Sequence, residues 1–339
     1  MLDTRITIKM IETAINKGIR DIEDNPKRGI RNLVDLAKHF ANSPFQKDIL
    51  HLMQTMLANL NSPYYHIVLD IINNVNHDTI KNFGINLGYK SWTYGAKKIR
   101  ENQKKYGCSI PWTIIFDFSQ EKKINFSIDN IANVIKQGKE IGIYTYMFFM
   151  NNINDLSCIL RENLDCAFVL YIASDILTEE NISEIKSYNN TVFSVLYEPS
   201  MNVDHFENAI QLLNKNKCLF GLHSYYGDEN TNDILNDKWV DEIVEYKSSF
   251  GILIESESCS EENASLVQDY AFNSKFNQKH YAFLIDLYED IARIDRNISK
   301  EACIFTVMGN GDTSSYNFSK EKEYNIKNMS LTNILSESY

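Results

Sequence analysis

Three side chains in the second half of the sequence could carry acid–base chemistry. Glu198 and Glu255 could act as paired carboxylates, and His223 with Glu198 could form a general base and the group that orients it. A divalent metal on Glu198, His223 and Asp228 is an alternative use of the same region. A third interpretation is structural, because loops at the edge of any parallel α/β sheet are polar. All three interpretations place these residues at the carboxyl ends of parallel strands, where such folds bind ligands.

Five further residues are expected at the same edge, each after an apolar segment. We expect them to contact a substrate or ligand: Asp117, Asn151, Asn152, Asp175 and Tyr225. The six cysteines form no zinc or iron–sulfur motif, since none lies within three residues of another. The cysteines therefore provide no metal site, and Glu198, His223 and Glu255 are the candidates for catalysis.

The segments that would position these residues are short and rich in β-branched and aromatic side chains. Strands are expected at residues 112–118, 143–149, 167–172, 191–198, 218–225 and 250–255. Amphipathic helices are expected at residues 128–141, 152–162, 179–187, 203–214, 238–246 and 261–273. Six successive βα units imply parallel strands with right-handed crossovers. They fit a partial (β/α)6 barrel, a full TIM barrel or an open sheet.

The two flanks of this region have different patterns. Apolar residues at helical spacing run through residues 5–75 and are interrupted at Asn25-Pro26, Ser43-Pro44 and Asn61-Ser62-Pro63. Four or five helices are expected before residue 107. The βα rhythm degrades after about residue 277, where Asn310-Gly311-Asp312 predicts a hairpin between 304–308 and 316–318. We therefore expect a helical bundle or cap at 1–106, a barrel at 107–276 and a carboxy-terminal region at 277–339.

The net charge of −11 is distributed unevenly along the chain. Residues 1–106 hold 16 Lys and Arg against 10 Asp and Glu, whereas the remainder holds 18 against 35. An acidic body disfavours nucleic acid as a partner. The basic run at 97–105 could dock an acidic partner or form a solvated helix face. With no secretory signal and no apolar run long enough for a membrane span, we expect a cytoplasmic protein with reduced thiols and no membrane partner.

Several segments occur in an order that is typical of one protein family. They are the lead-in at 82–86, 94–95 and 98–100, the first strand at 111–119, the next helix and strand at 137–144, a later strand and loop at 220–230, and a tail at 310–312, 325–327 and 330–331. Together they resemble radical S-adenosylmethionine (radical SAM) proteins with a helical amino-terminal extension and an auxiliary carboxy-terminal cluster region. The resemblance spans roughly three quarters of the chain. It implies an α/β fold, a partial (β/α)6 TIM-like barrel of the radical SAM type with a helical N-terminal extension.

The chain departs from this family at its functional positions. The family's C-x3-C-x2-C loop is missing after the first strand, where Ser119-Gln120-Glu121-Lys122-Lys123 leads to a helix near Ser127. The family's Gly-Gly-Glu-Pro motif, which binds the amino group of S-adenosylmethionine, is replaced by Met150-Asn151-Asn152-Ile153. The auxiliary cysteine after Asn-Gly-Asp is absent, and Tyr316 lies near its place. Iron–sulfur clusters need thiolate ligands, so both cluster sites are expected to be lost.

The resemblance and these departures predict a catalytically degenerate radical SAM-like protein without iron–sulfur clusters. We expect a binding or accessory scaffold for a peptide or a partner enzyme, such as an intact radical SAM homologue or a second copy of the chain. No cofactor is expected, and S-adenosylmethionine is the one ligand left open. The alternative is a non-radical enzyme with a polar site at the strand ends, built on Glu198 and His223.

Overall fold

The computed structural model describes residues 4–41, 44–119, 125–198, 201–315 and 324–337. By its internal contacts the chain divides into two compact units. The first unit comprises residues 1–81 and 193–289, and the second comprises residues 82–192 and 290–339. The domain borders expected after residues 106 and 276 rest on sequence pattern and stay a prediction.

The second unit is built on a row of strands in the order β10-β9-β8-β1-β2-β3. Four of them are parallel: β8 (Phe305–Met308), β1 (Thr113–Asp117), β2 (Thr145–Phe149) and β3 (Ala167–Ile172). The other two, β9 (Asp312–Ser315) and β10 (Tyr324–Asn325), are antiparallel. The β8–β9 turn confirms the predicted hairpin, since Gly311 adopts φ +92° and its N–H donates to the Met308 carbonyl at 2.9 Å. Its second limb begins at Asp312, whereas the expected limb at 316–318 lies outside the described residues.

The second unit also contains helices, several of which connect its strands. They are the π-helical segment η1 (Ile85–Gly95), α6 (Ala96–Tyr106), α7 (Ile128–Ile141), α8 (Ser157–Glu162), α9 (Glu179–Ile185), most of α14 (Leu287–Ser299) and α15 (Leu331–Glu337). Two short 3₁₀ turns, η2 (Ser174–Ile176) and η3 (Lys186–Tyr188), flank α9. The helix expected at residues 128–141 is confirmed, and Ser127 caps it by accepting the Asn130 N–H at 3.3 Å.

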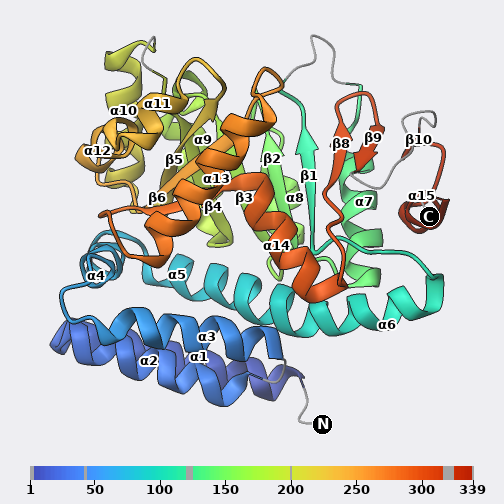
Figure 1. Ribbon diagram of the computed structural model, residues 1–339. Coiled ribbons are helices and arrows are strands. Elements are labelled where there is room, and N and C mark those ends of the chain that lie inside the picture. The colour runs from blue at the N-terminus through green and yellow to red at the C-terminus, as the bar shows by residue number, and fades with distance from the viewer. Residues whose placement is uncertain (1–3, 42–43, 120–124, 199–200, 316–323, 338–339) are drawn as a thin grey trace. The chain divides into compact units, whose positions relative to one another are not determined.

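The first unit combines amino-terminal helices with the later strands. Its helices are α1 (Thr4–Asp24), α2 (Pro26–Phe40), α3 (Pro44–Ala58), α4 (Tyr64–Asn74), most of α5 (His77–Gly84), α10 (Val203–Lys215), α11 (Thr231–Leu235), α12 (Lys238–Glu245) and α13 (Glu261–Phe276). Most of β4 (Thr191–Leu196) joins β5 (Phe220–Tyr226), β6 (Phe250–Glu255) and β7 (Phe283–Asp286) in one parallel row. Helices α1, α2 and α3 lie side by side as a bundle (Figure 1). Asn25 and Pro26 separate α1 from α2, as the sequence predicted, and Asn25 accepts the Arg28 N–H.

Both faces of the parallel strands are buried, which explains their continuous apolar sequences. Every residue of β2 is buried, and the ring of Phe148 stacks on Phe116 of β1 with centroids 4.7 Å apart. On the other face of the same strand, Phe149 stacks on Tyr171 of β3 at 4.4 Å. These aromatic side chains are therefore core, and only residues beyond the strand ends are free to form a site.

Two glycines let α6 approach the end of α7. Gly142 follows α7 with φ +114°, and a Cβ on it would lie 2.6 Å from the Gly95 carbonyl oxygen. A Cβ on Gly95 would in turn clash with the Gly142 carbonyl. Only glycine at both positions permits this backbone contact.

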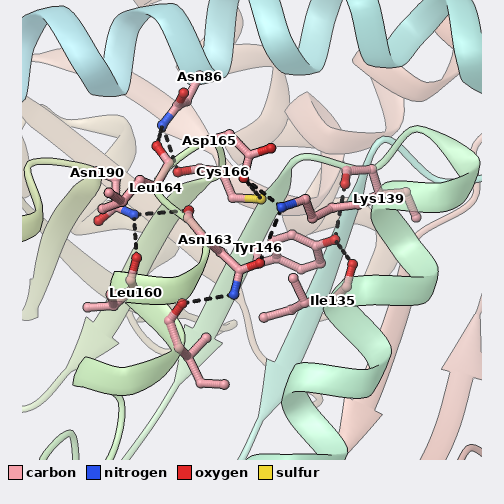
Figure 2. A network of polar contacts seen from close by, with 12 residues as sticks. Asn86, Ile135, Lys139, Tyr146, Leu160, Asn163, Leu164, Asp165, Cys166 and Asn190 are labelled. Atoms are coloured by element: carbon pink, nitrogen blue, oxygen red, sulfur yellow. Dashed lines mark hydrogen bonds and ion pairs between the residues drawn. The ribbon is translucent and has the colours of Figure 1, made fainter.

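A polar network fastens the amino ends of β3 and β4 (Figure 2). Asn190 is fully buried, and its Nδ2 donates to the carbonyls of Leu160 at 3.1 Å and Asn163 at 3.2 Å. Nearby, the Lys139 ammonium lies 2.6 Å from the Asp165 carboxylate. The Asn190 amide thus gives a second donor to two carbonyls at the end of α8, each of which also accepts a backbone N–H. We conclude that this edge is structural.

The fold class is the one that the sequence predicted, an α/β fold of parallel strands with a helical amino-terminal region. The strands expected at 167–172 and 250–255 are confirmed to the residue. The expectation that the alternation of strands and helices breaks down after residue 277 is wrong, because β7, α14 and β8 continue this alternation. No helix among the described residues is both long and apolar enough to cross a membrane.

Candidate functional site

A polar cavity opens beyond the carboxyl ends of β2 and β3, within the second unit. Its volume is about 600 Å³, and it is lined by Asn151, Asn152, Asn154, Ile176, Thr178, Glu180, Asn181 and Glu184. Two of these residues, Asn151 and Asn152, are among the ligand-binding candidates from the sequence. Carboxyl-end cavities are the usual ligand sites of parallel α/β folds, so this is the candidate functional site.

The start of α9 forms one wall of the cavity through a capping box. The Thr178 hydroxyl accepts the Asn181 N–H at 3.2 Å, and the Asn181 side-chain oxygen accepts the Thr178 N–H at 2.9 Å. Asn181 Nδ2 also donates to the Ile176 carbonyl at 2.8 Å. These three bonds use the polar groups of Asn181 and fix the wall in place, which leaves Glu180 and Glu184 as exposed groups on the same helix.

The loop after β2 forms the opposite wall and is tied to the loop after β1. Asp117 Oδ1 accepts both the N–H of Ser119 at 3.0 Å and its hydroxyl at 2.7 Å. The Ser119 carbonyl then accepts Asn151 Nδ2 at 2.7 Å. The Asn152 side-chain oxygen accepts the Asn154 N–H at 2.9 Å. The structure thus links the predicted residues Asp117 and Asn151 through Ser119, and Asp117 acts as a loop cap.

Asp175 lies beside the cavity without lining it. It is exposed in the turn η2, next to the lining residue Ile176. Its role as a ligand contact stays a prediction.

The other four candidates belong to the first unit, and His223 is the most deeply placed of them. Its side chain is 2% exposed, and its Nδ1 lies 3.0 Å from the Ser194 hydroxyl oxygen. Burial lowers the pKa of His223 to about 3. The imidazole is therefore neutral at physiological pH and shielded from solvent, whereas Glu198 is exposed after β4. Their pairing as base and orienter stays a prediction.

Glu255 and Tyr225 lie at the carboxyl ends of β6 and β5. Glu255 is half-buried, and burial raises the pKa of its carboxyl group. Within the part of the chain that the structure describes, nothing forms a hydrogen bond or ion pair with this carboxylate. Tyr225 packs edge-on against the His223 ring at 6.0 Å between centroids. Among the four candidates of this unit, Glu255 therefore combines a partly exposed side chain with a pKa that the fold raises.

Asp228, the third residue of the alternative metal set, has a structural partner. Its Oδ1 accepts the Ser260 N–H and hydroxyl at 2.9 and 2.7 Å, and Asn263 Nδ2 at 2.7 Å. These hydrogen bonds, first of all the one from the Ser260 backbone, lower the pKa of Asp228. Across the described ranges, no group of three or more His, Cys, Asp or Glu side chains could hold a metal ion.

Sequence reasoning missed six of the cavity residues: Asn154, Ile176, Thr178, Glu180, Asn181 and Glu184. One signal for them was present, because Thr178 and Asn181 have the spacing of a capping box before an apolar run. That pattern marks where α9 begins and hence which loop faces the carboxyl edge. It does not reveal that the loop after β2 stands opposite.

The cysteines are placed poorly for an iron–sulfur cluster at this edge. Four buried ones precede strands at their amino ends: Cys108 before β1, Cys166 before β3, Cys218 before β5 and Cys303 before β8. Cys158 begins α8 and Cys259 follows β6. Burial raises the pKa of the Cys166 and Cys303 thiols, whereas clusters are held by thiolates. The residues present therefore do not fit a cluster at the carboxyl edge.

Comparisons with known proteins give a likeness of fold. No protein-family model and no curated protein matches the sequence. SuiB of Streptococcus suis bound to S-adenosylmethionine matches with a TM-score of 0.51 and 12% identity, over 72% of this chain and 68% of that chain. SuiB bound to precursor peptide SuiA matches with a TM-score of 0.52 and 10% identity, over 72% and 69%. The protein anSMEcpe with bound AdoMet gives a TM-score of 0.41 and 11% identity, over 65% and 76%.

These comparisons correct one expectation and confirm another. The expectation of no cofactor is contradicted, because the SuiB structure of similar fold contains S-adenosylmethionine. The partial-barrel architecture is confirmed by the two SuiB structures. At 10–12% identity the likeness concerns the fold alone: the chain has a radical SAM-like fold.

Proposed function

We propose that this chain is a radical SAM-like protein without iron–sulfur clusters that acts as a binding or accessory scaffold for a peptide or a partner enzyme. One observation carries the proposal. Four cysteines lie at the amino ends of strands, and the two that follow strands, Cys158 and Cys259, are single thiols far apart in the sequence, while the cavity at the carboxyl edge is lined by amides and carboxylates. Carboxylate and amide groups are suited to hydrogen bonding with an organic ligand, whereas the iron of an iron–sulfur cluster is held by thiolates.

A peptide is the ligand class with the most support. The cavity offers side-chain amides, a hydroxyl and two carboxylates around one apolar residue, a set that can bond to both donors and acceptors of a polypeptide backbone. The SuiB structure with a precursor peptide gives this fold a peptide-bound example.

S-adenosylmethionine is a second ligand for this chain. The SuiB structure with S-adenosylmethionine motivates it, and the two cavity carboxylates could pair with an ammonium group. Met150 and Asn151 stand where the family has two glycines, which changes the loop in which the resemblance places the amino-group contact. The chain would thus bind S-adenosylmethionine without cleaving it, because it lacks the iron–sulfur cluster that cleavage requires.

The alternative of a non-radical enzyme receives less support. Burial lowers the pKa of His223 to about 3, so the imidazole would be a weak base. Glu255 has a raised pKa, yet among the described residues its carboxylate forms no hydrogen bond or ion pair with a second titratable group. Its neighbours Tyr226 and Cys259 interact with it through charge alone.

The test combines selection for peptide binding with an assay for cleavage of S-adenosylmethionine. Purified chain is panned against a library of random dodecapeptides, and enriched peptides are measured by titration calorimetry. In parallel the chain is incubated anaerobically with iron, sulfide, dithionite and S-adenosylmethionine. We expect saturable peptide binding and no cleavage above a protein-free control. Reductive cleavage by the purified chain, or a library without any enriched binder, would contradict the proposal.

A further inference from the structure

We infer that the cavity after β2 and β3 binds a lysine or arginine side chain of a peptide together with the adjoining backbone. This inference rests on the proposed function and names its ligand class. Its basis is the chemistry of the eight lining residues, which include two carboxylates and no lysine, arginine or histidine.

The two carboxylates act on one face of α9. Glu180 and Glu184 are four residues apart in this helix, a spacing that places both side chains on the same side. In the described portions of the chain, neither carboxylate forms an ion pair with a lysine, arginine or histidine. Their negative charge is therefore available to a ligand, and it repels phosphate and other anions.

The amide groups on the opposite wall are oriented by bonds within the loop. Asn151 uses its Nδ2 on the Ser119 carbonyl, which leaves its side-chain oxygen as an acceptor. Asn152 uses its side-chain oxygen on the Asn154 N–H, which leaves its Nδ2 as a donor. One acceptor beside one donor matches a peptide unit, which offers one N–H and one C=O.

The size and composition of the cavity favour this ligand over a bare cation. A volume of about 600 Å³ is within the range of pockets for organic ligands and exceeds what a metal ion needs. Within the described residues no metal-binding group of three or more ligands is formed. A long basic side chain can lay its methylene groups against Ile176 while its charged end reaches Glu184.

The experiment uses the full chain labelled with ¹⁵N and three matched peptides. Each is a blocked Gly-Ser nonapeptide whose central residue is lysine, acetyl-lysine or glutamate. We expect the lysine peptide to shift the side-chain amide signals of Asn151 and Asn152, and to bind about 5- to 10-fold more tightly than the acetyl-lysine peptide at low salt. The preference should weaken in 0.5 M NaCl, since exposed ion pairs are screened.

Matched variants assign the effect to the cavity. Glu184→Gln should reduce the preference for lysine about 3-fold or more, whereas Glu162→Gln removes an exposed carboxylate outside the cavity and should leave it unchanged. Thermal unfolding checks that both variants fold. Equal affinity for the lysine and acetyl-lysine peptides, or an unchanged preference in Glu184→Gln, would overturn the assignment.

Three outcomes bear differently on this inference and on the proposed function. Peptide binding that leaves the Asn151 and Asn152 signals unmoved would overturn the site and leave the scaffold proposal standing. Free S-adenosylmethionine binding here, in competition with the lysine peptide and more tightly than it, would overturn the peptide assignment. Reductive cleavage of S-adenosylmethionine would overturn the proposed function and leave the cavity's preference for basic side chains intact.

Discussion

Replacing Asp295 by asparagine should change how the stability of the protein depends on pH. Asp295 lies on α14 and is fully buried. Its two carboxylate oxygens accept the backbone N–H groups of Trp112 at 3.0 Å and Cys303 at 3.1 Å, just ahead of β1 and β8. Burial raises the pKa of Asp295 to about 8, against the opposing effect of these two hydrogen bonds. Between about pH 4 and 8 the folded protein therefore holds a proton that the unfolded chain has released.

The sign and size of the effect follow from this difference. Because the native state binds more protons than the unfolded state, stability falls as pH rises through this window. Each pH unit contributes at most about 1.4 kcal/mol, so the limit between pH 5 and pH 8 is about 4 kcal/mol. Asparagine has the same shape and does not ionise, but it offers one acceptor in place of two. The variant Asp295→Asn should lose about 1 kcal/mol at pH 5 and be more stable than the parent at pH 8.

Urea unfolding followed by circular dichroism at half-unit steps from pH 5 to 8.5 measures both proteins. The quantity to compare is the difference in free energy of unfolding between the two proteins at each pH, since all other groups titrate equally in both. Asp269→Asn, which removes an exposed carboxylate on α13, is the control and should follow the parent at every pH. Parallel curves for the parent and Asp295→Asn would refute the reasoning, because they would mean that Asp295 titrates alike in the folded and unfolded states.

Three other predictions concern buried contacts. Gly95→Ala should destabilise the protein by about 2–4 kcal/mol in urea unfolding, because the added methyl group clashes with the Gly142 carbonyl. The control is Gly88→Ala in the same helical segment, where the methyl group meets no atom within 4 Å and should be neutral or slightly stabilising. Equal effects of the two substitutions would contradict the close contact. Asn190→Ala should cost about 1–3 kcal/mol, because it removes two hydrogen bonds that the buried amide donates to the Leu160 and Asn163 carbonyls. A loss under about 0.5 kcal/mol in the same assay would speak against the network. His223 should remain neutral in ¹⁵N-resolved NMR titration down to about pH 4, with stability falling as pH drops from 6.5 towards 3 because only the unfolded chain takes up the proton; a midpoint near 6.5 would show that the ring is accessible.

Much of the architecture could be predicted from the sequence because the second half of the chain is locally consistent. The strands at 167–172 and 250–255 are short apolar runs between amphipathic helices, so period and propensity point to the same assignment. The segment after residue 277 was harder to read. The strand β7 has only four residues, and α14 begins directly after it. The last strand residue, Asp286, also caps the helix by accepting the Glu289 N–H at 3.0 Å, so no separate loop marks the boundary.

The site could be predicted only in part, because the sequence does not show which way a side chain within a strand points. Asn151 and Asn152 follow a recognisable strand, so their place at the carboxyl edge could be predicted. His223 lies three residues before the end of β5, and a side chain inside a strand can face either the core or a ligand. Sequence pattern does not decide between these two, and the structure places the ring against Ser194.

Asp295 shows a second limit of sequence reading. A single acid in an amphipathic helix is usually assigned to the solvated face. Here it is held in the interior by two backbone N–H groups from segments about 180 and 8 residues away in the sequence. Such long-range partners leave no local pattern in the sequence.

Iron analysis after anaerobic reconstitution tests the central claim most directly. The full chain is incubated with excess iron, sulfide and reductant, desalted, and assayed for bound iron, acid-labile sulfide and charge-transfer absorbance. We predict that bound iron and acid-labile sulfide stay at the background level of a protein without a cluster, and that the same sample still binds peptide. Stoichiometric iron and sulfide that survive desalting, with the spectrum of a [4Fe–4S] centre, would contradict it.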